Sequence, residues 1–73
     1  MSGLPTMKPV KSSNVDAIGY RGTTLYVRFK GGGLYTYEGV PSEVYHAGLA
    51  AESVGSWFRS AVRGQFKHAQ HDQ

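Results

Sequence analysis

Five of the eight basic residues of this sequence fall in two sets that could hold phosphate groups. The chain has 73 residues, with 8 Lys+Arg against 5 Asp+Glu and a net charge of +3. Alternation along residues 24–30 places one set and an aromatic ring on one strand face, and a spacing of four places the other set on one helix face. The first set is Arg28 and Lys30 with Tyr26, and the second is Arg59, Arg63 and Lys67. Forked guanidinium groups suit phosphate and a flat ring suits base stacking, although a solvated polar face fits the same pattern.

A second candidate anion site lies at Ser53-Val54-Gly55-Ser56, where the helix that carries Arg59 and Arg63 is expected to begin. The free amides of a first helical turn, together with the hydroxyls of Ser53 and Ser56, would favour an anion there. Ser53 taken alone fits a plain N-cap better. Gly55 costs about 1 kcal/mol relative to alanine inside a helix. Either close packing on the sheet or the approach of a ligand to the backbone would explain this glycine.

The triple glycine at 31–33 favours a hairpin turn over a phosphate-binding loop. The phosphate-binding loop requires a Lys and a Ser or Thr before a helix, whereas Leu34 and Tyr35 follow here and open a strand. A bare glycine turn would nevertheless let a ligand approach the backbone closely. The hairpin is the interpretation that we favour.

The sequence predicts no catalytic residues, no metal site and no cofactor. The three histidines are at positions 46, 68 and 71, and the last two fall in a polar tail that cannot hold a general base within hydrogen-bond reach. The spacing His68-x-x-His71 supplies two metal ligands, fewer than a site requires. The absence of cysteine excludes a Cys-based zinc site. We therefore expect a protein that is not an enzyme.

The candidate site residues lie on elements that two hydrophobic patterns predict, alternation typical of strands and then spacing typical of helices. Residues 15–20, 24–30 and 34–38 carry strand signals separated by glycine turns, which predicts an antiparallel meander. Residues 42–50 predict a short helix, and a stripe from 54 to 66 predicts a second helix of about three to four turns. The members of that stripe are Val54, Trp57, Phe58, Ala61, Val62 and Phe66. The predicted class is α+β, a three-stranded antiparallel β-meander followed by two α-helices packed on one face. Alternation favours Tyr35 and Tyr37 facing these helices, with a stacking platform as the alternative.

The chain is expected to form one domain with short extensions. We assign residues 1–11 to an extended arm, because Pro5 and Pro9 disfavour regular structure there. Residues 12–67 form the domain and residues 68–73 a polar tail. No run approaches the ~18 apolar residues of a membrane span, and no signal peptide is recognised at the start. These features predict a cytoplasmic protein, in the host cytoplasm if the chain is viral, without a membrane partner.

Several short motifs follow one another in a specific order over residues 12–67. They are Ser12-Ser13, Tyr20, the alternating Leu25, Val27 and Phe29, Tyr35-Thr36-Tyr37, Val40-Pro41, Ala51-x-Ser53-x-Gly55, Trp57-Phe58, Val62 and Phe66. This series resembles the KTSC domain, which occurs at the C-terminus of some lysyl-tRNA synthetases and as a stand-alone bacterial or phage protein. Arg59 departs from the family, which often has Asn there. The resemblance implies RNA binding, the function suggested for the family.

A looser resemblance, in size and element order only, links the chain to viral sponge proteins that sequester immune signalling nucleotides. A thin core and exposed sheet edges favour a homo-oligomer. We therefore expect a non-catalytic binding module for a phosphate-bearing nucleotide, acting as a homo-oligomeric phage-type sponge. The candidate site residues are Arg28, Lys30, Arg59, Arg63, Tyr26, Ser53 and Ser56. The alternatives are a KTSC module that binds short RNA and a structural or protein-interaction domain without a ligand.

Overall fold

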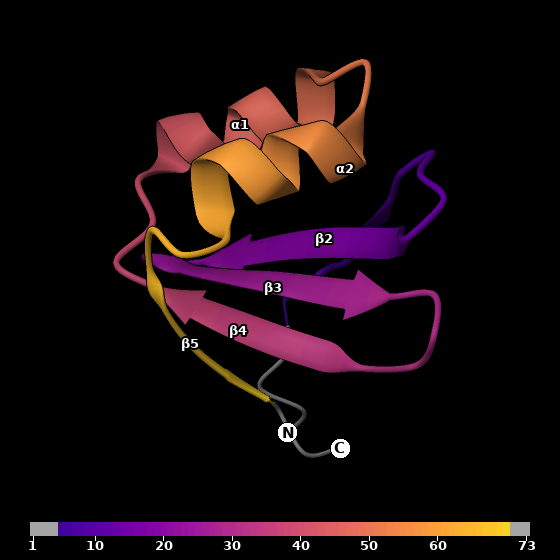
Figure 1. The fold of residues 1–73 in the computed structure, drawn as a ribbon. Helices are drawn as coiled ribbons and strands as arrows, with labels where there is room; N and C mark the ends of the chain where they lie inside the picture. Colours follow the sequence, from indigo (N-terminus) through magenta and orange to yellow (C-terminus); the bar gives the residue numbers. More distant parts are fainter. Residues whose placement is uncertain (1–4, 71–73) are drawn as a thin grey trace.

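A five-stranded antiparallel sheet carries two helical segments on one face (Figure 1). The structure is a computed structural model that describes residues 5–70. Residues 1–4 of the predicted arm and residues 71–73 of the predicted tail, including His71, lie outside the described residues. The elements are β1 (Lys8–Pro9), β2 (Val15–Arg21), β3 (Thr24–Phe29), β4 (Leu34–Glu38), α1 (Ser42–Ala50), α2 (Val54–Trp57), the π-helical segment η1 (Phe58–Val62) and β5 (Lys67–Gln70).

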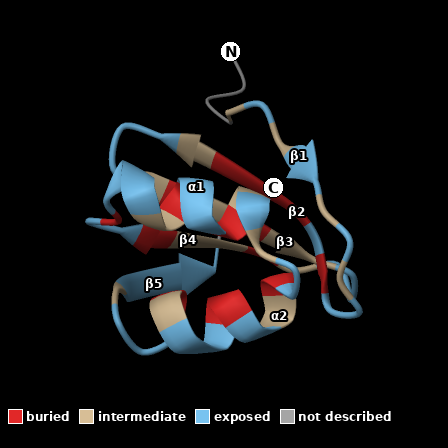
Figure 2. Ribbon diagram, turned by 90° about the horizontal axis from the view of Figure 1, so that it is seen from above, coloured by how far each residue is buried: buried red, intermediate tan, exposed pale blue. Residues whose placement is uncertain are grey.

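The α+β class and the central meander are confirmed, but the prediction of three strands is wrong. The sheet has the order β1-β2-β3-β4-β5. Strand β1 pairs with β2, placing Lys8 opposite Ile18, and β5 pairs with β4, placing His68 opposite Tyr37. Both added strands are exposed along their whole length, as Figure 2 shows. These strands join the sheet at its open edges through backbone hydrogen bonds. Their sequences therefore lack the hydrophobic alternation that would predict a strand.

The register of the central strands places the large apolar side chains on the face that the helices cover. Leu25 pairs with Tyr37 and Val27 pairs with Tyr35, so all four side chains share one face of the sheet. Leu25, Val27 and Tyr37 are buried there, and Tyr35 is half-buried against the same core. The hairpin between β3 and β4 turns through Gly32 with a φ of 105°, a conformation that glycine adopts without a steric penalty.

Helix α1 matches its predicted bounds, whereas the second helix is shorter than predicted. The helical backbone ends at Val62, because Arg63 is extended and Gly64 has a φ of 79°. Phe66 is therefore half-buried beyond the helix, from where it still packs against the core. Arg63 lies just beyond the helix in an extended conformation and Lys67 lies in β5, so neither shares a helix face with Arg59, and that part of the prediction is also wrong.

Trp57 of α2 packs against α1 and connects the two helical segments. Its indole nitrogen donates a hydrogen bond to the carbonyl oxygen of Val44 in α1, with 3.0 Å between the two atoms. The ring lies so close to Gly48 that a Cβ there would come within 2.5 Å of it. Buried residues of both helical segments and of the central strands meet between the layers (Figure 2). No helix within residues 5–70 is long and apolar enough to cross a bilayer.

Candidate functional site

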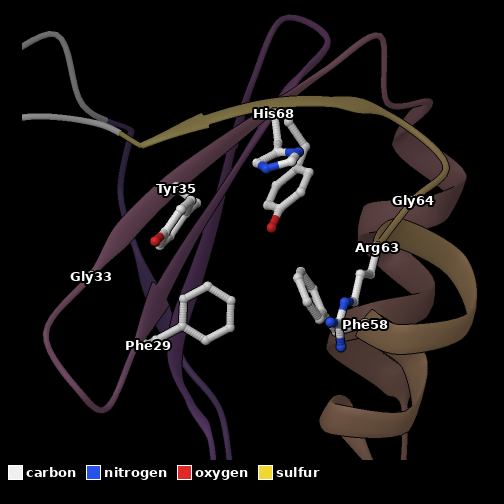
Figure 3. A pocket seen from close by; sticks show the side chains of 8 residues that line it. Phe29, Gly33, Tyr35, Phe58, Arg63, Gly64 and His68 are labelled. Atoms are coloured by element: carbon white, nitrogen blue, oxygen red, sulfur yellow. The ribbon is translucent and has the colours of Figure 1, made fainter.

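A cleft of about 670 Å³ opens between the sheet and the second helical segment, which consists of α2 and η1 (Figure 3). Its volume lies within the range of about 300–1,000 Å³ that is typical of small-molecule sites. Strands contribute Phe29, Tyr35 and His68, and these face Phe58 and Arg63 from the helical layer. The complete lining is Phe29, Gly33, Tyr35, Tyr37, Phe58, Arg63, Gly64 and His68.

Five rings form a closed circuit of contacts among the residues that line this cleft. Phe29 meets Tyr35 edge-on with ring centroids 5.6 Å apart and meets Phe58 edge-on at 5.4 Å. Tyr37 meets Phe58 edge-on at 5.5 Å and stacks on His68 at 5.6 Å. His68 closes the circuit with Tyr35 at 6.4 Å. Such separations are those of favourable aromatic pairs, so the rings support one another in a fixed arrangement.

Strand pairing brings these rings together from distant parts of the sequence. Phe29 ends β3, and Tyr35 and Tyr37 occupy alternate positions of β4, so all three project from the same sheet face. His68 lies on β5 directly opposite Tyr37. Phe58 reaches the cleft from η1, which covers the sheet. The more buried Tyr37 and Phe58 form the floor, and the exposed His68 forms part of the rim.

The electrostatic environment of the cleft is positive. Arg63 is the only residue of the lining that carries a full positive charge, and no Asp or Glu lines the cleft within the described residues. Burial raises the pKa of Tyr37, the neighbouring Tyr35 raises it further, and the Arg63 guanidinium acts in the opposite direction. The Tyr37 hydroxyl therefore stays protonated at neutral pH and can donate a hydrogen bond.

A second cavity of about 360 Å³ adjoins the first and shares three of its walls. Phe29, Phe58 and Arg63 line both cavities. The remaining walls of the second cavity are Asn14, Val15, Gly31, Gly55 and Arg59. A terminal nitrogen of Arg59 lies 3.4 Å from the hydroxyl oxygen of Ser56, which it contacts as a donor. We refer to these two adjoining cavities together as the groove; rings make up most of the first lining, and the second adds Arg59 to the shared Arg63.

Two of the seven predicted site residues, Arg59 and Arg63, meet in this groove, and the other five lie outside it. Arg59 and Arg63 line the second cavity together. Tyr26 and Arg28 alternate with the buried Leu25 and Val27, which places them on the opposite face of the sheet. Lys30, in the turn after β3, lines neither cavity. Within one chain the sheet therefore separates Arg28 from Arg59 and Arg63.

The two predicted serines form a helix cap outside both cavities. The Ser53 hydroxyl oxygen accepts a hydrogen bond from the backbone amide of Ser56, with 3.3 Å between the atoms. The two hydroxyl groups are also hydrogen-bonded at 3.1 Å. Both residues are exposed, and neither lines the groove. Their geometry matches the plain N-cap interpretation of Ser53.

Three rings of the groove, those of Phe29, Phe58 and His68, were not among the predicted site residues. Phe29 and Phe58 were assigned to the core by their apolar periods, and they do pack there while one side of each lines the groove. His68 was assigned to a polar tail, because β5 carries no alternating pattern. The spacing of Tyr35 and Tyr37 was the sequence feature that pointed to an aromatic site. Residues at alternate strand positions share a face, so the two rings could form the stacking platform that was the alternative interpretation.

Metal-binding geometry does not arise among residues 5–70, where no three His, Cys, Asp or Glu side chains cluster. His68 is stacked on Tyr37, and no serine, threonine or cysteine lines either cavity in the described part of the chain. The arrangement is suited to holding a flat ring and an anion.

Comparison with known proteins identifies relatives along nearly the whole chain. The KTSC domain family model matches residues 11–66. A protein of Tsukamurella paurometabola is 43% identical over 63 residues, covering 84% of this chain and 94% of its own length. A protein of Stutzerimonas stutzeri is 40% identical over 58 residues, covering 77% and 82% respectively. The crystal structure of a KTSC domain protein from Yersinia pestis superimposes with a TM-score of 0.88 at 30% identity, covering 92% of this chain and 97% of that one.

Proposed function

This chain belongs to the KTSC domain family, and we propose that it binds a nucleotide without acting on it chemically. The base would occupy the aromatic cleft. The observation that carries the proposal is the circuit of five rings around a cleft whose rim holds Arg63. Aromatic side chains beside a guanidinium group are the usual means of holding a base and its phosphate.

The charge of the cleft distinguishes this ligand from a cationic one. An aromatic lining of this kind also suits a methylated ammonium group through cation–π contacts. Arg63 would repel such a cation, and no carboxylate lines the cleft within residues 5–70 to compensate. A flat ring that carries negative charge matches both properties of the site.

The size of the basic surface favours a small nucleotide over a longer RNA. The guanidinium groups of the groove are those of Arg59 and Arg63, and Arg28 lies on the other face of the sheet. A single-strand binding surface typically continues its positive charge along several nucleotides. An RNA site would therefore need the chain to assemble with further copies.

Isothermal titration calorimetry with nucleoside monophosphates, cyclic dinucleotides and a short single-stranded RNA tests the proposal. Replacing Tyr35→Leu removes a ring from the cleft while keeping apolar volume, and it should weaken nucleotide binding by about 1–3 kcal/mol. Tyr26→Leu is the matched control, because Tyr26 is also half-buried but on the opposite face. Binding that Tyr26→Leu weakens and Tyr35→Leu leaves intact would contradict this site. Affinity that rises steeply with RNA length would favour the RNA module.

A homo-oligomeric sponge adds assembly to this binding, and it has its own support. All four residues of β5 are exposed, and the strand is at one end of the sheet order. Strands at a sheet edge present unpaired backbone groups that can pair with another chain. Mass measurement in solution at several concentrations tests the assembly. A strict monomer that still binds the nucleotide would contradict the sponge and leave the binding module standing.

A further inference from the structure

We infer that the second cavity is a phosphate subsite, so the ligand is a nucleotide whose phosphate lies one cavity away from its base. The inference rests on the proposed function, because it assumes that a base occupies the aromatic cleft. It goes further by assigning the phosphate to Arg59 and Arg63 in the second cavity.

The walls that the two cavities share support one ligand that spans both. Phe29, Phe58 and Arg63 belong to both linings. The two phenyl rings meet edge-on at 5.4 Å and form the boundary between the cavities. A ring stacked in the aromatic cleft would therefore place its attached sugar and phosphate next to Arg63. Arg59 lines the second cavity but not the first, so it lies beyond that boundary.

The chemistry of the second cavity is that of an anion site. Neither Arg59 nor Arg63 has an ion-pair partner among the residues that the structure describes, and no carboxylate from those residues lines the cavity. The contact that Arg59 makes is the 3.4 Å hydrogen bond to the exposed Ser56 hydroxyl, which an incoming anion can replace. Arginine presents several donors in a plane and holds phosphate through more than one of them.

Gly55 supplies an independent observation at the same cavity. A Cβ added at Gly55 would lie 3.5 Å from a terminal nitrogen of Arg59 and 3.8 Å from the Ser12 hydroxyl oxygen. Both separations are ordinary contacts, so packing does not require glycine here. The helix nevertheless keeps a residue that lowers its stability. Without a side chain, Gly55 leaves the second cavity open beside Arg59. The approach of a ligand to the backbone would explain why glycine occupies this position.

These features define the class of ligand. A nucleoside alone would fill the aromatic cleft and leave both guanidinium groups without a counter-ion. A methylated ammonium would meet positive charge in both cavities. A nucleotide with a terminal or bridging phosphate next to the sugar satisfies the rings and the guanidinium groups at once.

Affinities of adenosine, guanosine and their 5′-monophosphates test the assignment by calorimetry. In the unmodified protein the monophosphate should bind at least about tenfold more tightly than its nucleoside, as charge-assisted hydrogen bonds to phosphate imply. Arg59→Ala should reduce this ratio to about threefold or less and leave nucleoside affinity within about twofold. Arg28→Ala, on the opposite face, is the matched control and should preserve the ratio.

A second variant tests whether the phosphate needs the free volume of the second cavity. Gly55→Leu keeps both arginines and projects a side chain into the second cavity, so it should weaken the monophosphate and spare the nucleoside. Nucleosides that bind as tightly as their monophosphates would overturn the phosphate subsite while leaving the proposed function intact. A ratio unchanged in both variants would also overturn it. Failure of all four probes to bind would instead count against the proposed function itself.

Discussion

Two glycines in the helical layer should respond to alanine substitution with opposite signs. Gly48 lies in α1 and Gly55 in α2. A Cβ at Gly48 would come within 2.5, 2.7 and 2.7 Å of three carbon atoms of the buried Trp57 indole. At Gly55 the nearest atoms would be 3.5 Å and 3.8 Å away. The first methyl group must displace a packed ring, whereas the second fits without movement.

The expected magnitudes follow from these distances. Gly55→Ala gains helix propensity without a clash and should raise the free energy of unfolding by about 0.5–1 kcal/mol. Gly48→Ala makes the same local gain, but overpacking typically costs about 1–3 kcal/mol. Moving the indole also weakens its hydrogen bond to Val44, whose atoms are 3.0 Å apart, at a cost of about 1 kcal/mol. The net result for Gly48→Ala is a loss of about 1–3 kcal/mol.

Urea denaturation followed by tryptophan fluorescence measures both effects, because the chain has 1 tryptophan and it lies at the perturbed contact. In a domain of this size 1 kcal/mol shifts the melting temperature by about 4–8 °C, so thermal melts provide a second reading. Gly48→Ala should also change the native fluorescence, and Gly55→Ala should not. If Gly48→Ala proves as stable as the unmodified protein, the packing of Trp57 against α1 is not as described.

Three further changes test other parts of the structure. Ser53→Ala removes the side chain that accepts from the Ser56 amide and should lower the free energy of unfolding by about 1 kcal/mol in chemical denaturation. Tyr37 has a pKa above its ordinary value of 10.0, so its contribution to stability is present below about pH 10 and is lost as the pH rises through the folded pKa. Tyr37→Phe should therefore lose less stability between neutral and alkaline pH, measured by urea midpoints, and an identical alkaline loss would contradict the raised pKa. Trp57→Phe should lose the hydrogen bond to Val44 and about 1 kcal/mol, visible as a lower urea midpoint.

The central elements were predictable because their patterns are local. The alternation over β3 and β4 specified both strands and the face that each side chain takes. The bounds of α1 followed from Pro41 before it and the helical spacing within it. The apolar stripe overran the second helix because Phe66 packs against the core from beyond Gly64. An apolar side chain can satisfy the core from a turn as well as from a helix, so the stripe alone does not mark where the helix ends.

The edge strands were not predictable in the same way. Strand β5 is exposed throughout and is held by pairing with β4. Backbone hydrogen bonds do not depend on side-chain type, so a polar segment reads as a tail whether or not it pairs. The consequence for the site is direct, because β5 carries His68 opposite Tyr37 and completes the circuit of rings.

The sequence by itself determined the family, the α+β class and the apolar faces of the central elements. Only the tertiary structure decided which of the basic residues share a surface. Strand alternation directs Arg28 away from the helices, whereas Arg59 on the covering helix and Arg63 just beyond its end both line the second cavity. The physical reason is that periodicity places a side chain on a face of its own element, whereas long-range pairing decides which faces meet.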